Sequence, residues 1–176
     1  MKMNKLALAI SALVMAGGAM AQSTASVNGT ANATVIAPIT LATANSLEFG
    51  KIVKGSGTVT IAAADGARTD SDPSLTPGGT QKGLVQAGTF NVTGEKGFTY
   101  AITIPVGGLT LSGPASASML VNNFTVVSGA GDVSGLVGTI DATTGLGSLK
   151  VGATLNPANQ GAGAYTGTYS VTVAYN

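Results

Sequence analysis

Hydrophobic and polar residues alternate with a period of two along most of the chain. The first regular stretch covers residues 25–35, where Ser, Asn and Thr occupy the even positions. The apolar face of this stretch consists of Val27, Gly29, Ala31, Ala33 and Val35. Successive side chains of a β-strand point to opposite faces, so the pattern predicts a strand about 36 Å long at roughly 3.3 Å per residue. Pro38 ends it, because proline has no N–H to donate to a sheet.

The chain closes with a second long alternating stretch, residues 165–176. Thr, Ser, Ala and Asn fill its even positions. Its other face carries Tyr165, Gly167, Tyr169, Val171, Val173 and Tyr175. Such alternation over a whole segment is typical of a strand with one face against the core and one face in water.

Further strands are expected between these two stretches, at residues 47–53, 57–63, 87–93, 98–104, 119–128 and 146–155. Clusters of Gly, Pro, Asp and Asn separate them, and the four residues 94–97 have the composition of a hairpin turn. No amphipathic helical face of useful length follows the first 21 residues. Many strands divided by frequent turns predict an all-β fold, an antiparallel immunoglobulin-like β-sandwich.

The N-terminal 21 residues have the features of a secretory signal peptide. Lys2 and Lys5 precede an apolar run, residues 6–15, and small residues follow up to Ala21, with cleavage expected before Gln22. The alternative is a membrane anchor, but the apolar run is too short for a hydrocarbon core of about 30 Å. We therefore expect an exported protein in the periplasm, at the cell surface or outside the cell, and no integral membrane protein. The predicted parts are a signal peptide (1–21), an N-terminal strand (22–37) and a β-sandwich domain (38–176).

The amino-acid composition excludes several classes of metal site and catalytic site. The 176 residues include no Cys, His or Trp, and charged residues make up 9%, against a usual value of about 25%. Zinc sites, iron–sulfur clusters, Cys nucleophiles and Ser-His-Asp triads are thereby excluded. Eight basic and seven acidic residues give no basic surface for nucleic acid, and loss of Lys2 and Lys5 with the signal leaves a formal charge of −1. We expect a protein without enzymatic activity, catalytic residues, cofactor or metal.

Two polar clusters contain residue types that could form a chemical site. Asp65, Asp70 and Asp72 are close enough in sequence to supply oxygen ligands to calcium, but they lack an EF-hand pattern, and a solvated loop is the favoured interpretation. Ser148 and Lys150 share a strand face and would be needed for a Ser/Lys dyad. The favoured interpretation is that both face water.

Two sets of residues resemble a known family. One is Val35-Ile36-Ala37-Pro38-Ile39-Thr40-Leu41 followed by Leu47-Glu48-Phe49-Gly50, and the other is the ending from Gly163 to Asn176. Together they resemble the bacterial secreted domain catalogued as domain of unknown function 4402, over nearly the whole chain after the signal. That family has no established activity, so the resemblance implies a class of domain and no particular role.

A weaker resemblance is to the subunits of chaperone–usher fimbriae. Tyr175 is the penultimate residue, and Gly163 is the fourteenth from the end. The resemblance implies an incomplete sandwich whose N-terminal extension fills the groove of the next subunit. It also implies a periplasmic chaperone and an outer-membrane usher as partners, beside other copies of the chain or related subunits. Two departures are the absence of a disulfide and an N-terminal face rich in Ala and Gly.

Two functions follow as hypotheses. In the leading one, the protein is a structural subunit of a bacterial surface fimbria or pilus-like polymer, with adhesion as a second role. The apolar face of residues 25–35 would enter a neighbour's groove by β-strand addition, and the C-terminal strand would form one wall of that groove. In the alternative, the protein is a self-contained secreted binding module whose N-terminal strand pairs within its own domain.

Overall fold

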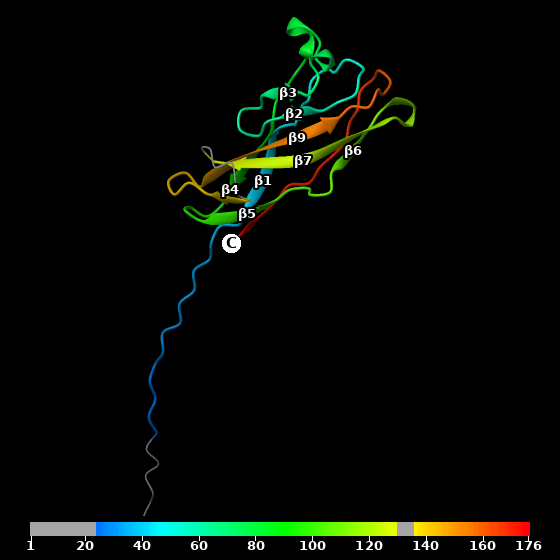
Figure 1. Cartoon of the computed structure of the whole chain (residues 1–176). Helices are drawn as coiled ribbons and strands as arrows, with labels where there is room; N and C mark the ends of the chain where they lie inside the picture. The colour runs from blue at the N-terminus through cyan, green and yellow to red at the C-terminus, as the bar shows by residue number, and fades with distance from the viewer. Residues whose placement is uncertain (1–23, 130–135) are drawn as a thin grey trace, which may run out of the picture. The chain divides into compact units, whose positions relative to one another are not determined.

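The computed structural model describes residues 24–129 and 136–176 (Figure 1). The chain divides into two units, residues 1–34 and residues 35–176. The expected signal peptide, with its cleavage position between Ala21 and Gln22, lies outside the described residues. The second unit is all-β, and every strand pair that it contains among the described residues is antiparallel.

The larger sheet has seven strands and is built around β9 (Leu146–Asn156). One edge of β9 pairs with β4 (Gly88–Thr93) and β2 (Val59–Ile61), and the other edge pairs with β7 (Ser118–Ser128). Beyond these lie β1 (Thr40–Asn45) next to β4, β3 (Arg68–Asp70) next to β2, and β6 (Leu109–Ser112) next to β7.

The smaller sheet has three strands in the order β10 (Thr172–Tyr175), β5 (Thr99–Thr103) and β8 (Val137–Thr139). Three short 3-10 helices, η1 (Pro73–Leu75), η2 (Gly79–Lys82) and η3 (Pro114–Ser116), lie in the connections. Side chains from both sheets, together with Ile140 directly after β8, form the main core: Phe90, Val92, Tyr100, Ile102, Val126, Ile140, Leu149 and Val151. The expected all-β sandwich is therefore confirmed.

Four expected strands agree closely with the structure, namely β4, β5, β7 and β9. The fifth, residues 57–63, is reduced to the three residues of β2. The expectation of a hairpin at residues 94–97 is wrong, because β4 and β5 belong to different sheets. The N–H groups of Gly94 and Gly97 donate to the carbonyls of Gly145 and Ile140, so the turn carries the chain from one sheet to the other.

The predicted strand at residues 47–53 is wrong. Only Glu48 makes a bridge there, with Gln86, and the rest of the segment hydrogen-bonds to loop carbonyls such as those of Lys82 and Leu75. The C-terminal prediction is correct only in part, since β10 covers four residues and residues 167–171 form no strand. Both segments alternate in sequence, but a strand also needs a neighbouring strand in register.

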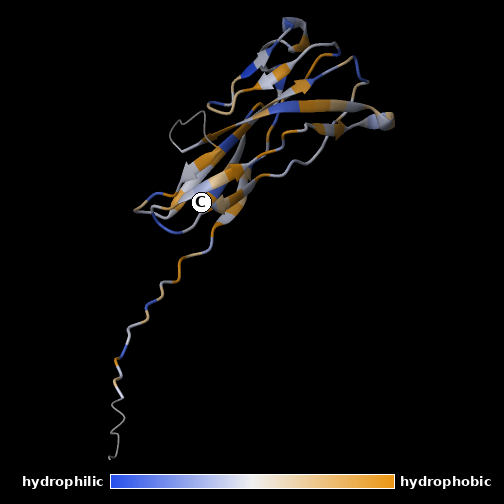
Figure 2. Cartoon of the chain, turned by 60° about the horizontal axis from the view of Figure 1, so that its bottom comes forward, coloured by the Kyte–Doolittle hydropathy of each residue, from blue (hydrophilic) through white to orange (hydrophobic). Residues whose placement is uncertain are grey.

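Residues 24–39 likewise form no strand, so the expectation of one at 25–35 is wrong for the chain alone. Val27 and Val35 are 93% and 95% exposed, and a side chain at Gly29 would meet nothing within 4 Å. Figure 2 shows the alternation as successive orange and blue residues along this segment. Because a strand is stabilised by cross-strand hydrogen bonds, an alternating segment without a partner has no reason to become one.

A second hydrophobic cluster lies beside the main core. Its buried members are Val59, Leu75, Val121, Ala153 and Leu155. One side of this cluster is the seven-stranded sheet, which supplies β2, β7 and β9. The other side is covered only by segments without regular strands, so this half of the sandwich lacks a second sheet.

Candidate functional site: an apolar groove beside the C-terminal segment

A groove of about 800 Å³ opens over the second cluster. Its two walls are residues 46–55 and residues 160–169, neither of which forms a strand. Side chains of β6, β7 and β9 form its floor, among them Leu111, Val121 and Leu155. The groove therefore follows the gap where the second sheet is missing.

The floor of the groove is apolar, whereas its walls also carry polar and charged residues, among them Glu48, Lys51 and Lys54. The half-buried residues that pack against the second cluster all line it, and they are Leu47, Phe49, Ile52, Leu109, Leu111, Met119 and Phe124. Incomplete burial of so many large side chains forgoes hydrophobic stabilisation, at about 25 cal/mol per Å² left in water. Partly exposed apolar side chains that gather in one hollow, with polar residues around them, are typical of a binding surface.

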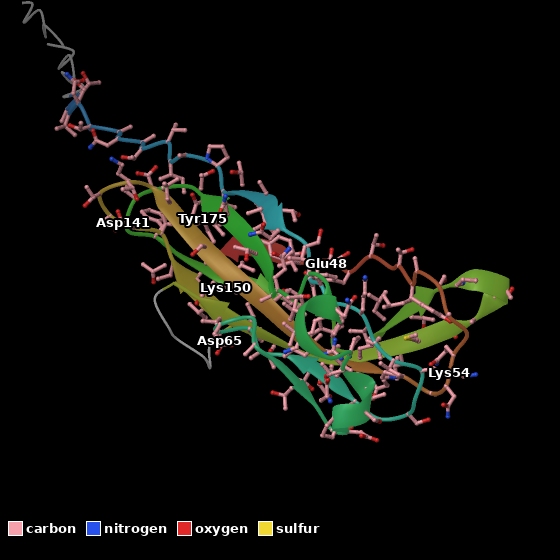
Figure 3. The ribbon with its side chains drawn as sticks, turned by 90° about the horizontal axis from the view of Figure 1, so that it is seen from above. Glu48, Lys54, Asp65, Asp141, Lys150 and Tyr175 are labelled. Atoms are coloured by element: carbon pink, nitrogen blue, oxygen red, sulfur yellow. The ribbon has the colours of Figure 1, made fainter. Side chains whose placement is uncertain are left out.

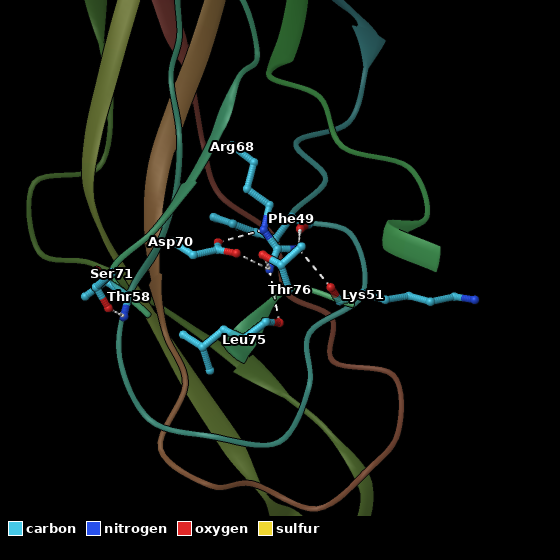
Figure 4. Close-up of polar contacts among 8 residues, drawn as sticks. All are labelled: Phe49, Lys51, Thr58, Arg68, Asp70, Ser71, Leu75 and Thr76. Atoms are coloured by element: carbon cyan, nitrogen blue, oxygen red, sulfur yellow. Dashed lines mark hydrogen bonds and ion pairs between the residues drawn. The ribbon is translucent and has the colours of Figure 1, made fainter. Parts of the chain in front are cut away.

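Arg68 on β3 holds the first wall in place (Figure 4). Its guanidinium makes a two-point ion pair with Asp70, with Nε–Oδ1 at 2.7 Å and Nη2–Oδ2 at 3.0 Å. Nη1 also donates to the carbonyls of Phe49 and Lys51 at 2.9 and 2.8 Å. The two side chains are only 6% exposed. This wall is therefore positioned by a buried arginine instead of by strand pairing.

The second wall contains two residues singled out from the sequence, Gly163 and Tyr165. Gly163 has φ +154°, which side-chain-bearing residues rarely adopt, and a Cβ there would overlap the ring of Pro114. The ring of Tyr165 lies against Gly113, and its hydroxyl donates to the Gly161 carbonyl at 2.8 Å. Glycine at 163 is thus required by the backbone and by close packing at the start of this wall.

The second wall has a free backbone edge. Thr166 bridges to Ser112 of β6, and β10 pairs with β5. Between these points, residues 167–171 make no backbone hydrogen bond to any part of the chain that the structure describes. Unpaired N–H and C=O groups along an extended segment are a template for an added strand.

Tyr169 marks one end of the groove. Its ring packs edge-on against Phe90, with centroids 6.1 Å apart, and tilted against Phe124 at 5.4 Å. Its hydroxyl lies against the backbone of Gly88. Burial raises the pKa of this phenol to about 12. Tyr169 therefore stays neutral and joins the groove to the main core.

The remaining apolar residues of the C-terminal segment pack against the main core. Val171, Val173 and Tyr175 are half-buried against it. The Tyr175 hydroxyl donates to the Ala37 carbonyl at 2.8 Å and accepts from the Glu95 N–H at 2.6 Å. The penultimate tyrosine thus fixes the start of the domain, which is a structural role inside the single chain.

The polar clusters do not form a chemical site. Asp65 accepts from the Ala67 N–H, and Asp70 pairs with Arg68. Asp72 caps η1, and hydrogen bonds from Ser74 hold its pKa below the ordinary value. Within residues 24–129 and 136–176, no group of three or more Asp or Glu side chains is placed to hold a metal ion. Figure 3 shows the labelled acidic residues Glu48, Asp65 and Asp141 apart from one another.

The Ser/Lys pair is equally separate from the groove. Ser148 and Lys150 are both exposed, as expected. The Lys150 ammonium donates to the Ala64 carbonyl at 3.1 Å, so it is engaged with a loop and not with Ser148.

Sequence reasoning missed several residues of the groove, above all Leu109, Leu111 and Arg68. The signal for β6 was present, because Leu109 and Leu111 alternate with Thr110 and Ser112 directly after two glycines. Arg68 gave no such signal. A lone arginine between aspartates looks like part of a solvated loop until its buried carbonyl partners are known.

The groove, the free backbone edge at residues 167–171 and both sheets lie within the part of the chain that matches a protein family. Residues 39–175 match the family described as Domain of unknown function (DUF4402), and the chain belongs to this family. No curated protein and no solved structure matches the chain significantly. Among the residues that the structure describes, no helix is long and apolar enough to cross a membrane.

Proposed function

We propose that the protein is a structural subunit of a bacterial surface polymer of the fimbrial or pilus type, exported and assembled by β-strand complementation. In this mechanism the N-terminal segment of one copy, residues 25–35, completes the missing sheet of a neighbour. The donor face is Val27, Gly29, Ala31, Ala33 and Val35. Adhesion, a periplasmic chaperone and an outer-membrane usher belong to the same proposal.

One observation carries the proposal: the chain contains both an apolar groove that lacks a strand and an alternating segment that lacks a partner. Each feature alone is unfavourable in water, since the groove leaves large apolar side chains partly wet and the segment leaves Val27 and Val35 exposed. Burying the two valines would contribute roughly 1.5–3 kcal/mol each. Backbone hydrogen bonds along the added strand would contribute the rest of the binding free energy.

The alternative, a self-contained secreted module, requires the N-terminal strand to pair within its own domain. The structure describes residues 24–39 without a strand, an observation that supports the first proposal more than this alternative. It still predicts a distinct behaviour, namely a monomer at all concentrations whose N-terminal segment is dispensable.

The experiment compares the full chain with a deletion of residues 22–35, both exported with the native leader. The matched control is Val27→Thr/Val35→Thr, which keeps the segment and its strand propensity but removes the apolar donor side chains. Gel filtration and negative-stain electron microscopy report oligomers and fibres. We expect polymers from the full chain, none from the deletion, and strongly reduced assembly from the double variant. Normal polymers from the deletion would refute the proposal.

A further inference from the structure

The N-terminal segment contains the single Asn-Gly pair of the sequence, Asn28–Gly29. Both residues are exposed and belong to no strand. Within the described part of the chain, no hydrogen bond engages the Asn28 side chain or the Gly29 N–H. A Cβ at Gly29 would meet nothing within 4 Å. The side-chain amide and the backbone nitrogen that follows it are therefore both open to water and to each other.

An asparagine followed by glycine has the chemistry to close a succinimide ring. The Gly29 nitrogen loses its proton to hydroxide and attacks the side-chain carbonyl carbon of Asn28. A C–N bond forms there, and the side-chain nitrogen leaves as ammonia. Water then opens the ring at either carbonyl, which gives aspartate or isoaspartate. Glycine favours the attack because it has no Cβ to obstruct the ring and the widest choice of backbone conformations.

Other asparagines of the domain are held differently. Asn45 and Asn91 lie in the paired strands β1 and β4. The Asn122 side chain accepts a hydrogen bond from Asn156 at 3.1 Å. Asn156 is followed by Pro157, whose nitrogen has no proton to lose. Exposure, an unengaged amide and a following glycine therefore coincide at Asn28.

We propose that Asn28 is a site of spontaneous deamidation, by attack of the Gly29 nitrogen, in copies whose N-terminal segment is unpaired. The product carboxylate places a negative charge in residues 22–35, which contain no charged side chain. The isoaspartyl product also routes the backbone through the former side chain. This adds a methylene group to the main chain between Val27 and Ala31, so the two residues no longer alternate in register.

The consequence for assembly rests on the proposed function. A copy with a deamidated segment pairs less well with a neighbour, so the reaction limits the time during which a free copy can donate its strand. Pairing, in turn, fixes the backbone of the segment and slows ring closure. The modification itself needs no partner, and its rate is measured independently of any polymer.

Peptide mapping of the full chain, exported with the native leader and incubated in dilute solution at pH 8, tests the site. No Lys or Arg lies between Lys5 and Lys51, so trypsin leaves Asn28, Asn32 and Asn45 in one peptide. Fragmentation by electron transfer assigns the mass change to one asparagine and separates aspartate from isoaspartate. Asn32 is the internal reference, because it lies in the same exposed segment but precedes Ala33.

Gly29→Ala is the matched control, since its added Cβ meets nothing in the chain. We expect Asn28 to deamidate at least about tenfold faster than Asn32, and at least about tenfold faster than in Gly29→Ala. Equal rates at Asn28 and Asn32, or a rate at Asn28 that Gly29→Ala leaves unchanged, would overturn the site.

Assembly of fresh and incubated chains tests the consequence. Parent chain with Asn28 fully converted should form at least twofold less polymer than fresh parent. Asn28→Ser, which has no amide to lose, should assemble equally before and after incubation. Converted parent that assembles as well as fresh parent would overturn the limit on strand donation. Fresh parent that never forms polymer would overturn the proposed function together with this limit, and the peptide map would still decide the deamidation site.

Discussion

Replacing Arg68 by alanine would remove the group that holds the first wall of the groove. The substitution deletes a two-point ion pair with Asp70 and the hydrogen bonds to the carbonyls of Phe49 and Lys51. Asp70 would remain, as a carboxylate that is 6% exposed and without its partner. The backbone hydrogen bonds of this wall to Leu75, Lys82, Gln86 and Asn159 would remain.

The expected loss of unfolding free energy is about 3–5 kcal/mol, the usual cost of leaving one member of a buried ion pair behind. The matched variant Arg68→Met/Asp70→Leu removes both charges and retains volume. It should recover most of the loss, because apolar replacement of a whole buried pair is often close to neutral. A residual deficit of roughly 1–2 kcal/mol is expected, since the carbonyls of Phe49 and Lys51 stay without the donor.

Urea denaturation followed by tyrosine fluorescence measures these differences, with Lys150→Ala as the exposed-cation control. Lys150 makes one exposed hydrogen bond to Ala64, so its loss should cost less than about 0.5 kcal/mol. Hydrogen exchange should be faster at the Lys51 and Val53 amides in Arg68→Ala than in the parent. The reasoning is refuted if Arg68→Ala costs no more than Lys150→Ala, or if the double variant is no more stable than Arg68→Ala.

Three further predictions concern other parts of the domain. Tyr100 is fully buried, and its hydroxyl has no hydrogen-bond partner among the residues that the structure describes, so Tyr100→Phe should leave thermal stability unchanged or raise it by up to about 1 kcal/mol. Gly138→Ala should cost about 1–3 kcal/mol in the same melts, because its Cβ would overlap the Tyr100 ring; equal melting curves for the two variants would contradict this packing. Hydrogen bonds from Thr144 and Thr143 lower the pKa of Asp141, so its contribution to stability is present above about pH 4 and is lost as the pH falls through the lowered pKa. The stability difference between the parent and Asp141→Asn should therefore shrink in acid, and a difference that is constant from pH 2 to pH 7 would show that this carboxylate is not the cause.

Sequence periodicity predicted the long central strands because each has neighbours along most of its length. The alternating strands β4 and β9 pair with each other in register. Their inward-facing residues include Val92 and Leu149, which are both fully buried. Short edge strands gave weaker signals. β3 is Arg-Thr-Asp, which has the composition of a loop, and its pairing with β2 is fixed by tertiary structure.

The same periodicity failed at the groove for a physical reason. Residues 47–53 and 167–171 alternate like strands, yet the first is held by Arg68 and loop carbonyls, and the second has a free edge. Pattern alone records a preference for extended backbone with one apolar face, and it cannot say whether a partner strand is present in the same chain. The alternating segment at residues 25–35 is the third case, and all three belong to one unfilled position in the sandwich under the proposed mechanism.

Hydrogen exchange measured on assembled polymer and on dilute monomer tests strand complementation most directly. The account predicts that the amides of residues 25–35 and 167–171 exchange rapidly in the monomer and become protected together in the polymer. Protection should be lost in both segments when the polymer is dissociated. Polymer in which residues 25–35 still exchange at the rate of the monomer would contradict the account.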